Sequence, residues 1–275
     1  MKTRTSLSPT RCMSVGIHGV ILALVLAGQA FASDPTTAEA GHANAKSTTS
    51  QVHTSVERFE VGSLQVERHG ERGSPVILIP GLASGAWVWE DTVRGLQDSQ
   101  VIYVVTLAGF DGRPAQAGKG MQGAIDALQQ LIATQQLERP VLIGHSLGGV
   151  LALALAERQP GLVGGVISID GLPVFPGTES MTPEQRSAMA EGTKARMANV
   201  DAKAFAAQQV QYMQMIGVID AGTGARLAQL TAKSNPGATA DFMAETLAFD
   251  LRTRLPKISA PVLLLSPYNP ADGAA

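Results

Sequence analysis

The residues with the clearest chemical potential lie at 139–152, with the sequence RPVLIGHSLGGVLA. The apolar run 141–143 is followed by Gly-His-Ser-Leu-Gly-Gly, and small and apolar residues continue from 150 to 156. This order predicts a buried strand that turns sharply into a buried helix, with Ser146 at the turn. In such a nucleophile elbow the flanking glycines leave room for the turn, and the serine Oγ stands clear of the sheet. The start of the helix offers N–H groups and a positive dipole to a developing anion, so the pattern indicates nucleophilic attack by Ser146.

The elements that must position this serine follow from apolar periodicity. Two alternating segments around Gly62-Ser63 predict an antiparallel ribbon, and continuous apolar runs further along predict buried strands separated by helices. The expected strands are 56–61, 64–68, 76–79, 101–107, 141–143, 162–169 and 262–265, and the first helices are 87–96 and 120–136. The alternation of strand and helix predicts an α/β fold with a mostly parallel sheet.

Residues 173–250 are rich in Ala, Gln and Met and contain no strand-like run. Helices are expected near 183–200, 202–215, 225–233 and 238–251. A helical insertion of this length between two strands predicts a lid over the edge of the sheet. Its methionines are either ordinary helix packing or the lining of an adaptable apolar pocket, namely Met189, Met197, Met213 and Met215.

The loop after 76–79 reads Pro-Gly-Leu-Ala-Ser-Gly-Ala-Trp, which is too rich in Gly and small residues for regular structure. Such a loop brings backbone N–H groups close to a ligand. We interpret Trp87 and Trp89 as anchors of the core and of this loop rather than as binding aromatics.

The first 32 residues have the pattern of a secretory signal: a basic start, an apolar stretch at 15–28 and Ala30-Phe31-Ala32. We expect cleavage near Ala32 and export to the periplasm or medium. The alternative is a membrane anchor, but the apolar stretch is shorter than the ~20 residues that span a bilayer. Residues 33–55 predict a disordered lead-in. Cys12, the only cysteine, lies in the segment that we expect to be removed.

Composition excludes several classes of function. The chain has 275 residues, of which 45% are hydrophobic and 16% charged, and this suits one folded domain over residues 56–275. Its formal net charge of −2 and the lack of a long basic run give no case for nucleic-acid binding. The five histidines show no spacing typical of metal ligands, so we expect neither a metal nor a cofactor.

Taken together, the GHSLGG elbow, the PGL loop, the turn LAGFDGRP and the segment APVLLL resemble the α/β-hydrolase superfamily. The resemblance covers residues 56–275 and is to the single-domain branch with a helical cap, here about 173–250, inserted after the sixth strand. It implies an esterase-like serine hydrolase that acts on a carboxylic ester or related acyl bond of a small, apolar acyl substrate. Because relatives of this kind cleave different bonds, the bond type stays open.

The resemblance also implies roles for individual residues. Ser146 is the expected nucleophile, and the backbone N–H groups of Leu82 and Leu147 are the expected oxyanion hole. His145 takes a structural place beside the serine and is not the base. In this family the acid follows the seventh strand, which favours Asp272, while Asp170 after the sixth strand is the alternative.

No histidine follows Ser146 in the sequence. The family's catalytic histidine comes after an eighth strand, and that strand, the histidine loop and the final helix are all missing, so we expect a truncated hydrolase with negligible esterase turnover. The strand at 262–265 should then form an exposed apolar edge. The alternative function is a non-catalytic binding protein that retains the pocket.

Overall fold

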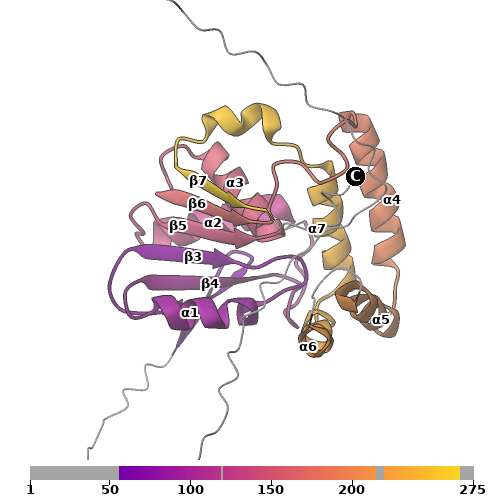
Figure 1. The fold of residues 1–275 in the computed structure, drawn as a ribbon, viewed down its shortest axis with the longest axis horizontal. Coiled ribbons are helices and arrows are strands. Elements are labelled where there is room, and N and C mark those ends of the chain that lie inside the picture. The colour runs from indigo at the N-terminus through magenta and orange to yellow at the C-terminus, as the bar shows by residue number, and fades with distance from the viewer. Residues whose placement is uncertain (1–55, 119, 215–219, 267–275) are drawn as a thin grey trace, which may run out of the picture.

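The computed structural model describes residues 56–118, 120–214 and 220–266, so the predicted signal sequence and lead-in lie outside the described residues (Figure 1). One seven-stranded sheet has the order β1-β2-β4-β3-β5-β6-β7. Its strands are β1 (Glu57–Val61), β2 (Leu64–His69), β3 (Pro75–Ile79), β4 (Val101–Leu107), β5 (Val141–His145), β6 (Gly165–Ile169) and β7 (Val262–Leu265). β1 and β2 pair antiparallel, β2 also runs antiparallel to β4, and the remaining pairs are parallel, which confirms the predicted fold class.

Alternation along the strands divides the core into two layers. Val76 and Leu78 of β3 pack on one face of the sheet with Trp89, whereas Ile77 and Ile79 pack on the other face. The helices on these faces are η1 (Ala86–Trp89) and α1 (Glu90–Leu96) on the first, and α2 (Met121–Thr134) and α3 (Leu147–Arg158) on the second. Every residue of α3 except Arg158 is buried, because its small and apolar side chains let it lie deep in the core. Burial of this kind stabilises the protein by roughly 25 cal/mol per Å² of apolar surface.

Four α-helices in the described residues between β6 and β7 confirm the predicted helical insertion. They are α4 (Pro183–Ala198), α5 (Ala202–Tyr212), α6 (Ala221–Thr231) and α7 (Pro236–Ala248), and we call them the cap. Figure 1 shows the cap beyond the arrowheads of the parallel strands. Each helix is preceded by an N-cap residue whose side-chain oxygen accepts a hydrogen bond from a backbone N–H of the first turn. These residues are, in order, Thr182, Asp201, Asp220 and Asn235. These N-caps make α6 and α7 begin earlier than apolar spacing predicted.

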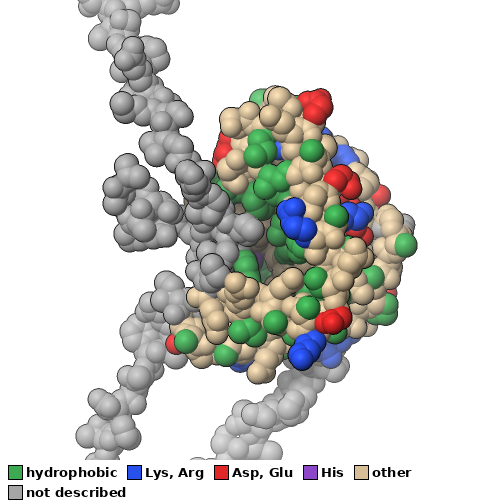
Figure 2. Space-filling model, turned by 90° about the vertical axis from the view of Figure 1, so that its right-hand side faces the viewer, with side chains coloured by type: hydrophobic (Ala, Val, Ile, Leu, Met, Phe, Trp, Pro, Cys, Tyr) green, Lys and Arg blue, Asp and Glu red, His purple; other side chains and the backbone are tan. Residues whose placement is uncertain are grey.

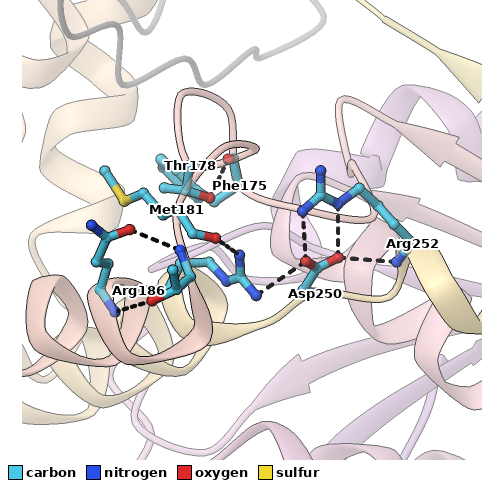
Figure 3. A network of polar contacts seen from close by, with 8 residues as sticks. Phe175, Thr178, Met181, Arg186, Asp250 and Arg252 are labelled. Carbon is cyan, nitrogen blue, oxygen red and sulfur yellow. Dashed lines mark hydrogen bonds and ion pairs between the residues drawn. The ribbon is translucent and has the colours of Figure 1, made fainter.

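A polar cluster ties the two ends of the cap together (Figure 3). Val174, where the chain enters the cap, forms an isolated bridge with Asp250, where it leaves. The Asp250 carboxylate accepts hydrogen bonds from Arg252 at 2.8 and 3.0 Å and forms an ion pair with the buried Arg186 of α4 at 3.1 Å. Arg186 also donates to the carbonyl of Met181 at 2.6 Å. The hydrogen bonds from Arg252, with the charge of Arg186, lower the pKa of Asp250 to about 2.

The last two strands differ in their surroundings. β6 begins at Gly165 rather than at 162, because Gly161 has a φ of 86° and the N–H of Leu162 closes a turn onto Gln159. β7 follows the short helix η3 (Arg252–Lys257), and its four side chains are 44–50% exposed. The predicted exposed apolar edge is therefore confirmed.

Candidate active site

Ser146 stands alone between β5, which ends at His145, and α3, which begins at Leu147. Its backbone has φ 51° and ψ −118°, a conformation that non-glycine residues rarely adopt. Its N–H donates to the carbonyl of Ile169 in the neighbouring strand at 2.8 Å, which helps to hold this conformation. Strain of this kind amounts to about 1–3 kcal/mol and is concentrated at functional sites.

The glycines around the serine are required by close contacts. A Cβ on Gly144 would lie 2.2 Å from the carbonyl oxygen of Gly148, and a Cβ on Gly148 would lie 2.1 Å from that of Ile79. A Cβ on Gly149 would lie 2.2 Å from the Oγ of Ser168. The first two contacts involve backbone, which cannot easily move. The expectation that side chains at these positions would collide with strand or helix is confirmed.

The predicted oxyanion donors lie on two segments that pack against each other. Leu147 is the first residue of α3, where backbone N–H groups have no acceptor within the helix. Leu82 lies in the loop after β3, and in that loop a Cβ on Gly81 would lie 2.9 Å from the Nδ1 of His145. The loop after β3 therefore contacts the elbow directly. Anionic oxygen at the start of α3 would be stabilised by the helix N-terminus.

Ser146 opens into a cavity of about 40 Å³ that it shares with Asp170. Its lining residues are Ser146, Leu147, Val150, Asp170, Leu172, Val174, Phe175, Pro176, Thr246 and Phe249. Asp170 directly follows β6, has a φ of 58° and is 9% exposed, and its N–H donates to Leu265 at 2.8 Å. The structure thus brings Ser146, the expected nucleophile, and Asp170, the alternative candidate for the acid, together in one cavity. Asp272, the acid favoured by the sequence, lies outside the described residues.

The two histidines in the described part of the chain do not serve as a base for Ser146. His145 is buried, burial lowers its pKa to about 4, and neither ring nitrogen has a hydrogen-bond partner among the described residues. His69 pairs with Ile102 near the start of β4, whereas the elbow follows the end of β5, so the two lie at opposite ends of the parallel strands. His69 also lies 3.5 Å from the carboxylate of Glu67. His145 is therefore a neutral packing residue.

Sequence reasoning missed the aromatic residues near the serine. Phe175 and Phe249, from the two ends of the cap, line the cavity. Tyr212 at the end of α5 is half-buried, and burial, followed by the negative charge of Asp170, raises the pKa of its hydroxyl. These aromatics are isolated in an Ala- and Gln-rich segment, so no periodic signal distinguished them. Trp89 lies in the core, as expected, and Trp87 packs against Leu227 and its neighbours in the cap.

Of the four cap methionines that the sequence singled out, Met213 has a packing role. Met213 is buried with Leu227 and Ala228, and Met189 is 39% exposed on α4. Met215 lies outside the described residues, and the methionines of the described cap do not line the cavity beside Ser146.

Figure 2 shows the face that carries the cap: hydrophobic side chains gather in a central hollow, with charges of both signs scattered around it. A larger groove of about 710 Å³ lies between α4, α7 and the turn after β4, and it contains neither Ser146 nor Asp170. In the described ranges we find no group of three or more His, Cys, Asp or Glu suited to a metal, and no helix long and apolar enough to cross a bilayer.

Comparison with known proteins agrees with this geometry. Residues 76–274 match the model of the alpha/beta hydrolase family. The chain belongs to this family. It is 26% identical over 212 residues to the pimeloyl-[acyl-carrier protein] methyl ester esterase of Vibrio atlanticus, a match covering 74% of the chain and 78% of that relative.

Two further similarities have different weight. The chain is 34% identical over 94 residues to the Biotin biosynthesis bifunctional protein BioHC of Cellvibrio japonicus, but this covers 34% of the chain and only 18% of that protein. The solved structure of a hydrolase from Pseudomonas aeruginosa has a TM-score of 0.64 at 15% identity, covering 78% of this chain and 80% of that one. This hydrolase structure supports the fold alone.

Proposed function

We propose that this member of the hydrolase family cleaves a carboxylic ester or a related acyl bond through Ser146. The observation that carries the proposal is the backbone of Ser146, with its φ of 51° between β5 and α3. This strained turn presents the hydroxyl at the carboxyl edge of the parallel strands, where ligands bind in such sheets. The similarity to a methyl ester esterase supports an ester as the substrate class.

In the proposed reaction, Ser146 Oγ attacks the carbonyl carbon and its proton passes to a base. The N–H groups of Leu82 and Leu147 stabilise the oxygen that becomes negative, the alcohol leaves with a proton, and water then hydrolyses the acyl-enzyme. Asp170 and Asp272 remain the two candidates for the acid that orients the base. The apolar cavity lining and the hollow face of the cap support a small apolar acyl substrate (Figure 2).

We further propose that turnover is impaired in the 275-residue chain, because neither described histidine is placed to act as a base for Ser146. His145 is buried with no hydrogen-bond partner among the described residues, and His69 pairs with Ile102 near the start of β4. A serine hydroxyl without a base is a poor nucleophile, and loss of the triad histidine lowers kcat by up to ~10⁶-fold. Fast hydrolysis of p-nitrophenyl acetate that Ser146→Ala abolishes would show that a base is present and would overturn the impairment.

The function itself is tested by covalent labelling. Purified protein is incubated with a fluorophosphonate, and the labelled residue is identified by mass spectrometry. We expect slow labelling at Ser146 and none in Ser146→Ala. Absence of labelling above the Ser146→Ala background refutes nucleophilic catalysis.

A second function that we propose is a non-catalytic binding protein that retains the cavity, because neither His69 nor His145 is placed to act as a base for Ser146. Such a protein would bind an intact p-nitrophenyl ester saturably while leaving it uncleaved and Ser146 unlabelled. We also propose export with cleavage near Ala32, supported by the sequence of residues 1–32. Amino-terminal sequencing of the protein from a bacterial periplasmic fraction tests this, and an intact Met1 there would contradict it.

A further inference from the structure

Ser234, at the junction of α6 and α7, connects the cap to the loop after β3 and to the turn after β4. The side chain is 3% exposed. Its Oγ donates a hydrogen bond to the carbonyl of Ala83 at 2.9 Å and accepts one from the N–H of Asp111 at 3.0 Å. Ala83 directly follows Leu82 in the loop after β3, and Asp111 lies in the turn after β4. One hydroxyl thus links three segments that are far apart in sequence.

Backbone hydrogen bonds fix Ser234 at this junction. The N–H of Asn235 donates to the carbonyl of Gly109 at 2.7 Å, and the N–H of Gly112 donates to that of Lys233 at 3.2 Å. The turn after β4 is therefore bonded to the cap on both sides of Ser234. Because its own main chain is held in this way, the hydroxyl has a defined position from which to hold Ala83.

Both partners of the hydroxyl have unusual backbones. Ala83 has a φ of 56° and Asp111 a φ of 48°, in the left-handed region that disfavours residues with a Cβ. Such conformations persist when tertiary contacts hold them. The Asp111 carboxylate also packs over the loop, because a Cβ on Gly85 would lie 2.4 Å from its Oδ2.

We infer that Ser234 is a positioning residue, which sets the direction of the Leu82 N–H by holding the carbonyl of Ala83. This inference rests on the proposed function, because it assigns the Leu82 N–H to the oxyanion hole. Loss of the Ser234 hydroxyl leaves the buried Ala83 carbonyl without this donor and lets the strained loop relax. The Leu82 N–H then no longer points at the developing anion, while the cavity that binds the substrate keeps its shape.

The expected consequence is a slower chemical step with unchanged binding. Complete removal of one oxyanion donor lowers rates by about 10²–10³-fold, so partial misplacement should lower them by about 10–100-fold. The test measures fluorophosphonate labelling of Ser146 as a function of reagent concentration, which separates the maximal rate from the half-saturating concentration. For Ser234→Ala we expect the maximal rate to fall by that factor and the half-saturating concentration to stay within about twofold.

Two variants make this test specific. Thr231→Val removes another buried hydroxyl, which in the described part of the chain bonds to the carbonyls of Leu227 and Ala228 in its own helix, and it should label like the unaltered protein. Ser234→Cys keeps the side-chain shape, but its thiol is a weak hydrogen-bond donor, so the maximal labelling rate should lie between those of Ser234→Ala and the unaltered protein. This variant replaces Ser234→Ala in the test if Ser234→Ala does not fold. Equal maximal rates for Ser234→Ala and the unaltered protein would overturn the inference, as would an equal loss in Thr231→Val.

Amide hydrogen exchange gives a readout that does not depend on catalysis. In Ser234→Ala, the amides of Asp111 and of residues 82–86 should exchange faster. The Asp111 N–H loses the hydroxyl that accepts its hydrogen bond, and the loop after β3 loses the hydrogen bond to the carbonyl of Ala83. If the unaltered protein is not labelled at all, the proposed function has failed, and exchange still decides the positioning role. Unchanged exchange at these amides would refute it.

Discussion

Replacement of Ser146 by glycine should stabilise the fold while removing the nucleophile. The φ of 51° and ψ of −118° at Ser146 are strained for a residue with a Cβ but accessible to glycine. Relief of this strain contributes about 1–3 kcal/mol to the free energy of unfolding. The greater flexibility of glycine in the unfolded chain lowers the free energy of unfolding by about 0.5–1 kcal/mol and so offsets part of this gain. The net gain should be ~1 kcal/mol, which raises Tm by about 2–4 °C for a domain of this size.

Ser146→Ala is the matched control, because it removes the same hydroxyl but keeps the Cβ and hence the strain. Thermal unfolding of the unaltered protein and both variants, followed by circular dichroism at one scan rate, makes the comparison. We expect Ser146→Ala to lie within about 0.5 kcal/mol of the unaltered protein and Ser146→Gly to be the most stable. If Ser146→Gly melts at or below the temperature of Ser146→Ala, the elbow stores no strain and the reasoning is wrong.

Three further predictions concern stability. Gly148→Ala should lower the free energy of unfolding, measured by urea titration, by more than ~3 kcal/mol, because the new Cβ would lie 2.1 Å from the carbonyl oxygen of Ile79. The control is Gly95→Ala in α1, where no described residue lies within reach of a Cβ, and this change should raise the free energy of unfolding by about 0.5–1 kcal/mol. Since burial lowers the pKa of His145 to about 4, stability should fall as pH drops from 6.5 to 4, and His145→Gln should flatten this dependence. The ionised carboxylate of Asp250, with its pKa lowered to about 2, stabilises the fold above pH ~4, and this stabilisation disappears as the pH falls to 2. Asp250→Asn should therefore lower Tm at pH 7 and remove the part of the fall in Tm between pH 4 and 2 that comes from this carboxylate.

Local signals were sufficient for much of the fold. The apolar runs that predicted strands around 76–79, 101–107 and 141–143 correspond to β3, β4 and β5, because continuous burial on both faces leaves a clear pattern. Helix starts in the cap were less well predicted, because N-capping oxygens rather than apolar spacing decide them. The start of β6 was misplaced because the turn at Gly161 depends on its backbone conformation.

For the site, sequence alone determined the elbow. An apolar run, then Gly-His-Ser-Leu-Gly-Gly, then small and apolar residues predicted the strand, the sharp turn at Ser146 and the helix, and the same residues carried the resemblance to the family. Only the tertiary structure decided which distant groups meet it. Asp170 joins Ser146 in one cavity, and Ser234 reaches Ala83 across 151 residues of sequence. A single polar side chain in a helical cap carries no periodic signal, because its partners are set by how the layers pack and not by its neighbours in the chain.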